Sequence, residues 1–152
     1  MSGPRIAYTD FVPAAYRGLA AASEALSHGV LGQRFVELVW LRVSQINGCA
    51  YCVDRHARAL LAEGEDFQRI NSLVTWREVD FYTPRERAAF AWAEAVNALN
   101  HTAIDARFES LAEHFDGREV AELTAAVALM NAWNRIAIAG HNPVARAPLQ
   151  AS

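Results

Sequence analysis

The chain has little that would suit a nucleic-acid partner or a membrane. Its 152 residues carry 14 Lys and Arg against 17 Asp and Glu, and the arginines are scattered. A nucleic-acid-binding domain favours a clustered basic surface, so we expect no such partner. The longest apolar run, residues 123–139, is interrupted by Asn131, Asn134 and Arg135. It falls short of the roughly 20 apolar residues that a membrane span needs, so we expect no membrane association.

Signals for export and extra cysteines are also lacking. Residues 1–5 do not lead into the apolar stretch of a secretory signal, so we expect a cytoplasmic protein. Only two cysteines are present, and they stand three residues apart. Structural disulfides are uncommon in a reducing compartment, so a close pair there is more typical of catalysis or metal binding.

Strand-like alternation, long linkers and internal repeats are absent, whereas helical signals recur. A length of 152 residues suits one domain, 1–152, with a real core. We therefore predict an all-α bundle of about six helices. The expected segments are 13–27, 33–46, a helix that Asn47 caps and that ends near Gly64, 67–74, 83–99 and 116–140, with a further brief helix over 105–115.

Two capping boxes and one unusually apolar helix support this bundle. Thr83 and Asp116 are each followed three residues later by glutamate, which is the signature of a capped helix start. The segment after Asp116 is apolar nearly all round, as in a helix at the centre of a bundle or an interface. We expect its polar residues to bond to neighbouring helices rather than to form a binding site: Asn131, Trp133, Asn134 and Arg135.

The two cysteines are followed by a histidine at helical spacing. At 3.6 residues per turn, an apolar arc is expected to face the interior, with charged residues opposite. The arc contains Cys49, Cys52, Val53, His56 and Leu60, and the opposite side contains Asp54, Arg55 and Arg58.

This arrangement has consequences for thiol chemistry. Cysteines three apart in a helical turn are close enough to be bridged. A helix N-terminus favours a thiolate, and His56 can accept a proton from Cys52. Burial opposes the charged form. From the residues alone, a structural zinc with Cys49, Cys52 and His56 as three ligands, or two small buried side chains, remain alternatives. Glu37 taken alone is expected on a solvated face.

Residues 37–56 resemble the core of the AhpD-like alkylhydroperoxidases, which belong to the carboxymuconolactone decarboxylase superfamily. The match consists of a glutamate, eleven intervening residues, Cys-x-x-Cys, three residues and a histidine. Residues 129–138 also resemble the family. The resemblance implies an all-helical fold and a homo-oligomer, often a trimer or a hexamer. It names Glu37, Cys49, Cys52 and His56 as catalytic residues.

The resemblance also implies an activity, which is reduction of hydroperoxides by the dithiol. Cys52 would attack the peroxide and become a sulfenic acid, and Cys49 would resolve it to a disulfide. Glu37 and His56 would relay protons. A dithiol donor, either a lipoylated or a thioredoxin-like protein, would restore the thiols. No metal, flavin or haem is implied as a cofactor.

Two features bear on the expected mechanism, and two other functions are alternatives to it. Tyr51 stands where the characterised hydroperoxidases have a histidine, so the proton relay is expected to differ. The helix-terminus argument favours a thiolate at Cys49, whereas the resemblance names Cys52 as the attacking residue. The alternative functions are a decarboxylase acting on a lactone acid, and a non-enzymatic helical assembly whose packing responds to oxidation of the dithiol.

Overall fold

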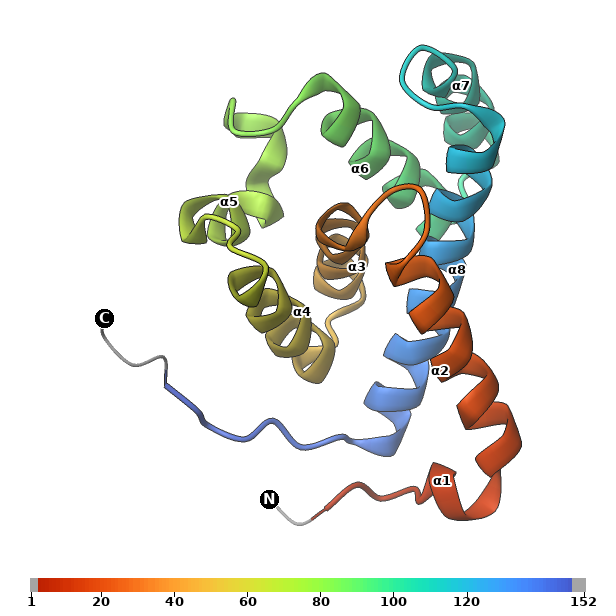
Figure 1. The fold of residues 1–152 in the computed structure, drawn as a ribbon, viewed down its shortest axis with the longest axis vertical. Coiled ribbons are helices and arrows are strands. Elements are labelled where there is room, and N and C mark those ends of the chain that lie inside the picture. The colour runs from red at the N-terminus through yellow and green to blue at the C-terminus, as the bar shows by residue number, and fades with distance from the viewer. Residues whose placement is uncertain (1–2, 149–152) are drawn as a thin grey trace.

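Helix α3 (Gln33–Asn47) is the element around which the others pack. In the computed structural model, which describes residues 3–148, it contacts α2 (Pro13–Ser27), α4 (Ala50–Ala62), α6 (Pro84–Asn97) and α8 (Gly117–Gly140). Figure 1 shows α3 nearly end-on between α4 and the α2–α8 side of the molecule. Because its neighbours surround it, α3 is buried almost continuously from Val36 to Ser44.

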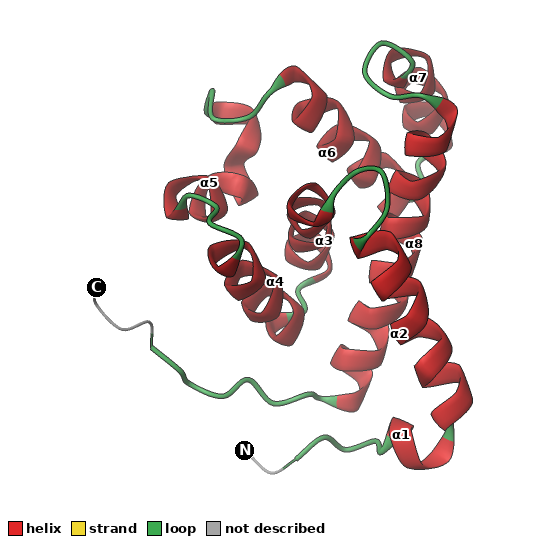
Figure 2. Ribbon diagram, viewed as in Figure 1, coloured by secondary structure: helices red, strands yellow, loops and turns green. Residues whose placement is uncertain are grey.

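The remaining elements are short. They are α1 (Tyr8–Phe11), α5 (Phe67–Ser72), the 3-10 helix η1 (Leu73–Glu78) and α7 (His101–Leu111). Residues 3–148 contain no strand (Figure 2), so the predicted all-α class is confirmed. The predicted number of about six helices is wrong, because this part of the chain forms eight α-helices and one 3-10 helix. Helix α1 escaped the prediction because it spans four residues and has neither a side-chain cap nor a buried residue.

Two predicted boundaries are also wrong. The brief helix expected over 105–115 is α7, which begins at His101 because the Asn100 side chain accepts a hydrogen bond from the Ala103 N–H. The helix expected over 67–74 ends at Ser72 and continues as η1. In both places a local cap or kink decides where a weakly periodic segment starts and stops.

Both predicted capping boxes are confirmed. The Thr83 hydroxyl accepts from the Glu86 N–H at the start of α6, and the Glu86 carboxylate accepts from the Thr83 N–H. The Asp116 and Glu119 pair makes the same reciprocal bonds at the start of α8. These bonds satisfy N–H groups that a helix start leaves without partners.

The core lies on two faces of α3. One cluster joins α3 to α6 and α8, and its members include Val39, Trp40, Trp92, Leu123 and Met130. The other joins α3 to α4, η1 and α6, and includes Leu38, Leu41, Leu60, Leu73, Trp76 and Phe90. Apolar side chains on both faces fix the rotation of α3 about its axis, because either face would lose its burial if the helix turned.

Asn131, Trp133 and Asn134 of α8 bond to neighbouring helices, as predicted, whereas Arg135 bonds to Asn131 within α8 itself. The Asn134 amide donates to the Ser44 hydroxyl at 3.0 Å and accepts from the Asn47 amide at 2.9 Å. The Trp133 indole N–H donates to the Ser23 hydroxyl at 2.8 Å. These bonds connect α8 to α3 and α2. Among the helices of residues 3–148, none is long and apolar enough to cross a membrane.

A two-residue turn joins α3 to α4 and controls where the cysteines lie. Gly48 has φ of 71°, a left-handed conformation that suits glycine, and ends α3. The residue that caps α4 is Cys49 rather than the predicted Asn47. Asn47 is instead the last residue of α3, where its amide bonds to the asparagines of α6 and α8. The short connection makes α3 and α4 a helical hairpin, so their facing side chains meet.

Candidate active site

Cys49 and Cys52 are bonded to each other, so the structure holds the oxidised form of the pair. Their Cα atoms are 5.3 Å apart, within the range that a disulfide needs, as the spacing predicted. The two residues are 1% and 3% exposed. Cys49 is the N-cap of α4, and its sulfur accepts a hydrogen bond from the Cys52 N–H at 3.3 Å. The pair therefore lies at a helix N-terminus and inside the protein.

Glu37 meets His56 across the α3–α4 hairpin. The carboxylate Oε2 lies 2.6 Å from Nδ1 of the imidazole, and the two residues are 7% and 5% exposed. The solvated position expected for Glu37 from its own helix is therefore wrong, because α4 covers that face. An ionised carboxylate can only accept, so Nδ1 carries the proton of this hydrogen bond. The other ring nitrogen, Nε2, is then the one free to accept a proton.

Trp40 holds the imidazole from the side of α3. Its ring centroid lies 5.6 Å from that of His56, at an interplanar angle of 48°. The Trp40 indole N–H donates to the carbonyl of Ala126 on α8 at 3.0 Å, which fixes the ring between the two helices. A side chain whose own position is fixed can orient the group it contacts. The imidazole is therefore held by a carboxylate, by an indole and by its own helix.

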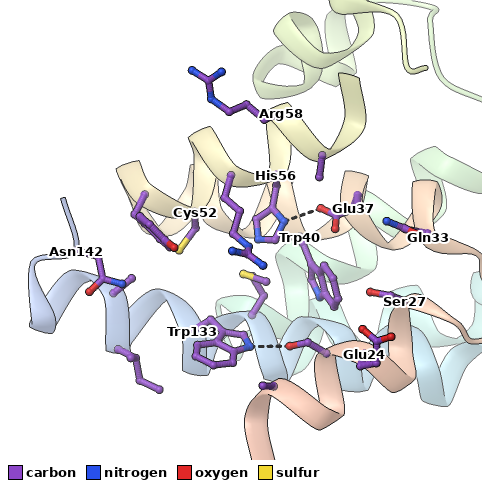
Figure 3. Close-up of a pocket in the computed structure, with 18 of the residues that line it drawn as sticks. Glu24, Ser27, Gln33, Glu37, Trp40, Cys52, His56, Arg58, Trp133 and Asn142 are labelled. Atoms are coloured by element: carbon purple, nitrogen blue, oxygen red, sulfur yellow. Dashed lines mark hydrogen bonds and ion pairs between the residues drawn. The ribbon is translucent and has the colours of Figure 1, made fainter. Parts of the chain in front are cut away.

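A cavity of about 780 Å³ opens beside these groups. Glu37, Cys52 and His56 line it, whereas Cys49 does not. Figure 3 shows Cys52 and His56 on the same helix, with Glu37 facing the imidazole from α3 and Trp133 on α8. Residues three or four apart on a helix are neighbours, so Cys52 adjoins His56. The cavity therefore brings a sulfur and a proton acceptor to the same space, and only one of the two sulfurs is accessible from it.

Side chains that the sequence did not nominate complete the cavity. Its apolar part comes from α2, α3 and α8 and consists of Tyr16, Ala20, Trp40, Met130, Trp133, Ile136 and Ala137. The Tyr16 and Trp133 rings meet edge to face, with centroids 5.1 Å apart. The polar cluster of α8 was predicted as structural, and Trp133 both makes a structural bond and lines this wall. No local pattern marks these residues, because they come together only when α2 packs on α8.

Charged side chains also line the cavity. Arg55 and Arg58 were expected on the far side of α4 from Cys52, but both line the cavity, so that expectation is wrong. The spacing of three between Cys52 and Arg55 could have revealed it, since such residues are neighbours on a helix. Tyr51 lines the same space. Within residues 3–148 no group of three or more His, Cys, Asp or Glu is arranged to hold a metal ion.

Comparison with known proteins identifies relatives along nearly the whole chain. Residues 12–95 match the model of the Carboxymuconolactone decarboxylase family. The uncharacterized protein YdfG of Bacillus subtilis is 32% identical over 142 residues, which cover 93% of this chain and 97% of YdfG.

Two solved structures share the fold. A protein of unknown function from Agrobacterium tumefaciens, provisionally described as the antioxidant defence protein AhpD, is 38% identical with a TM-score of 0.86, covering 93% of this chain and 99% of its own. An uncharacterized peroxidase-related protein from Ralstonia eutropha, described as an alkylhydroperoxidase AhpD core, is 25% identical with a TM-score of 0.80 and covers 92% of this chain and 76% of its own. The fold is therefore of the AhpD type.

Proposed function

This chain belongs to the carboxymuconolactone decarboxylase family, and on that premise we propose that it is a thiol-dependent peroxidase that reduces hydroperoxides with Cys49 and Cys52. One observation carries the proposal. The cysteines form a disulfide, and Cys52 lines a cavity. Cys52 adjoins the His56 imidazole, which is hydrogen-bonded to the buried carboxylate of Glu37. Dithiol peroxide reduction needs these parts, which are an accessible sulfur, a resolving sulfur and a proton relay.

The first step is attack by Cys52 on the hydroperoxide. In the reduced protein, Nε2 of His56 takes the thiol proton, and Glu37 stabilises the imidazolium through Nδ1. The thiolate then attacks one oxygen of the peroxide and the O–O bond breaks. The imidazolium returns its proton to the departing alkoxide, so an alcohol leaves and Cys52 becomes a sulfenic acid. Cys52 is preferred over Cys49 because it lines the cavity and adjoins His56.

The second step closes the disulfide seen in the structure. The Cys49 thiol attacks the sulfur of the sulfenic acid, and water leaves. The helix N-terminus helps this step, because free N–H groups there stabilise a developing thiolate on the capping cysteine. The sum is one hydroperoxide and two thiols converted to one alcohol, one water and one disulfide.

The third step restores the dithiol. An external dithiol, carried by a lipoylated or a thioredoxin-like protein, attacks the Cys49–Cys52 bond and leaves as its own disulfide. The cavity supports access for the donor to Cys52, since this is the sulfur that lines it. We also propose a homo-oligomer, a trimer or a hexamer, as the working form, because the resemblance to the family implies one.

The test measures hydroperoxide consumption with dithiothreitol as the dithiol, in the wild type and in the Cys52→Ser and Cys49→Ser variants. We expect turnover in the wild type and none in Cys52→Ser, whereas Cys49→Ser should turn over only as fast as dithiothreitol itself reduces the Cys52 sulfenic acid. With one equivalent of cumene hydroperoxide and no dithiol, the reduced wild type should lose about 2 Da and Cys49→Ser should gain about 16 Da, because its sulfenic acid has no partner. Cys52→Ser should keep its mass. Equal consumption rates in the wild type and Cys52→Ser would refute the proposal.

A further inference from the structure

The cavity beside Cys52 is much larger than a hydrogen peroxide molecule requires. A volume of about 780 Å³ is in the range that holds a substrate with a substantial organic body. Aromatic and thioether side chains form much of its wall, including Tyr16, Trp40, Met130 and Trp133. Such a wall favours an apolar or aromatic body, since burying apolar surface is what it can contribute to binding.

One cationic side chain of this wall has no partner among residues 3–148, whereas the others do. Glu37 bonds to His56 at 2.6 Å, and Glu24 pairs with His28 at 3.4 Å. Arg58 pairs with Asp54 at 3.0 Å and also donates to the carbonyl of Ala147. Arg55 lines the cavity too, but it has no hydrogen bond or ion pair with any of residues 3–148. Arg55 is therefore the cation of this wall that is available to an anionic ligand.

The position of Arg55 relates this charge to the reacting sulfur. Arg55 follows Cys52 by three residues on α4, so their Cβ atoms are neighbours at about 5–6 Å. A guanidinium presents a fork of N–H donors that matches a carboxylate. A ligand whose carboxylate binds Arg55 could therefore place a peroxide group at Cys52 if a short spacer, such as one aromatic ring, separates the two groups.

We propose that the cavity selects ligands with an apolar or aromatic body and a carboxylate, and that Arg55 is the residue that recognises the carboxylate. This inference rests on the proposed function, and the substrate class is then a carboxylate-bearing organic hydroperoxide rather than hydrogen peroxide or a neutral alkyl hydroperoxide. Arg55 sets specificity and takes no part in proton transfer.

Binding of an unreactive probe tests the inference independently of turnover. The probes are 4-isopropylbenzoate and its neutral counterpart 4-isopropylbenzamide, titrated by calorimetry into the oxidised protein. We expect the wild type to bind the carboxylate about five- to tenfold more tightly, the size expected for an ion pair at a partly exposed arginine. Arg55→Gln should remove this preference, and Arg55→Lys should keep part of it. Arg107→Gln is the matched control, because Arg107 is an exposed arginine on α7 whose side chain has no hydrogen bond or ion pair with residues 3–148 and lies outside this cavity.

Kinetics with the corresponding hydroperoxides then separate two roles of the charge. The substrates are cumene hydroperoxide with a para carboxylate and the same molecule with a para carboxamide. If Arg55 recognises the carboxylate, Arg55→Gln lowers kcat/KM about five- to tenfold more for the acid than for the amide, mainly through KM. An equal loss for both substrates would mean that Arg55 acts on the thiol and would overturn the inference.

The outcomes distinguish this inference from the proposed function. Absence of turnover with both hydroperoxides, together with Arg55-dependent binding of the benzoate, would reject the peroxidase and retain the carboxylate site. Turnover of both hydroperoxides with equal binding of the benzoate and the benzamide would retain the peroxidase and overturn the carboxylate site. No binding of either probe, or a preference that survives Arg55→Gln, would also overturn it.

Discussion

Replacing Glu37 with glutamine tests the proton relay with little change in shape. The variant keeps a hydrogen-bonding group at Nδ1 of His56 but removes the negative charge at 2.6 Å from it. A hydrogen bond to an ionised partner contributes about 1.5–3 kcal/mol, and one between neutral groups about 0.5–1.5 kcal/mol. The difference of about 1–2 kcal/mol applies where the imidazolium forms, and it corresponds to about a 5- to 30-fold loss of rate. We therefore expect kcat for hydroperoxide to fall by this factor and KM to stay unchanged.

The control for this variant is Glu65→Gln. Glu65 is also a buried, ion-paired carboxylate, bonded to Arg34 and Arg69, but it does not line the cavity. Its replacement should lower the free energy of unfolding by about 1–3 kcal/mol while the folded protein keeps its kcat. Steady-state kinetics and urea unfolding of both variants make the comparison. Full kcat in Glu37→Gln, or an equal loss of kcat in both variants, would refute the relay.

Two further predictions concern stability. Burial alone would raise the pKa of Glu94, but hydrogen bonds from Trp76, Arg77 and Arg42 outweigh it and hold the pKa below its ordinary value. This contribution to stability is complete above the unfolded pKa of about 4.5 and is lost as pH falls through the lower folded pKa. Between pH 7 and pH 3, the free energy of unfolding measured in urea should therefore fall less in Glu94→Gln than in the wild type. An equal fall in both proteins would contradict this assignment. Gly48 has φ of 71°, and no atom lies within 4 Å of an added Cβ, so a side chain there adds backbone strain but no clash. Gly48→Ala should therefore lower the free energy of unfolding by about 1 kcal/mol, and Gly48→Asn by less. Thermal unfolding that ranks the two variants in the opposite order would contradict this prediction.

The elements with strong local signals could be read from the sequence. Thr83 and Asp116 begin α6 and α8 where their capping boxes predicted, because the bonds of a capping box lie within four residues. The burial of Cys52 and His56 and the bridging distance to Cys49 also followed from helical spacing. Helix boundaries that a single asparagine marks were predicted wrongly. Asn100 was not recognised as a cap, and Asn47 was taken for one, because asparagine at a helix boundary can end one helix or begin the next.

The surroundings of the cysteine pair were decided by tertiary packing. Glu37 looks solvent-exposed on its own helix and becomes buried because α4 folds back over α3 through the turn at Gly48. Trp133 and Arg55 line one cavity because α2, α4 and α8 converge there, and no spacing along the chain encodes that convergence. Helix periodicity specifies which residues share a face of one helix. Only packing between helices specifies what that face meets, since those contacts join residues far apart in the chain.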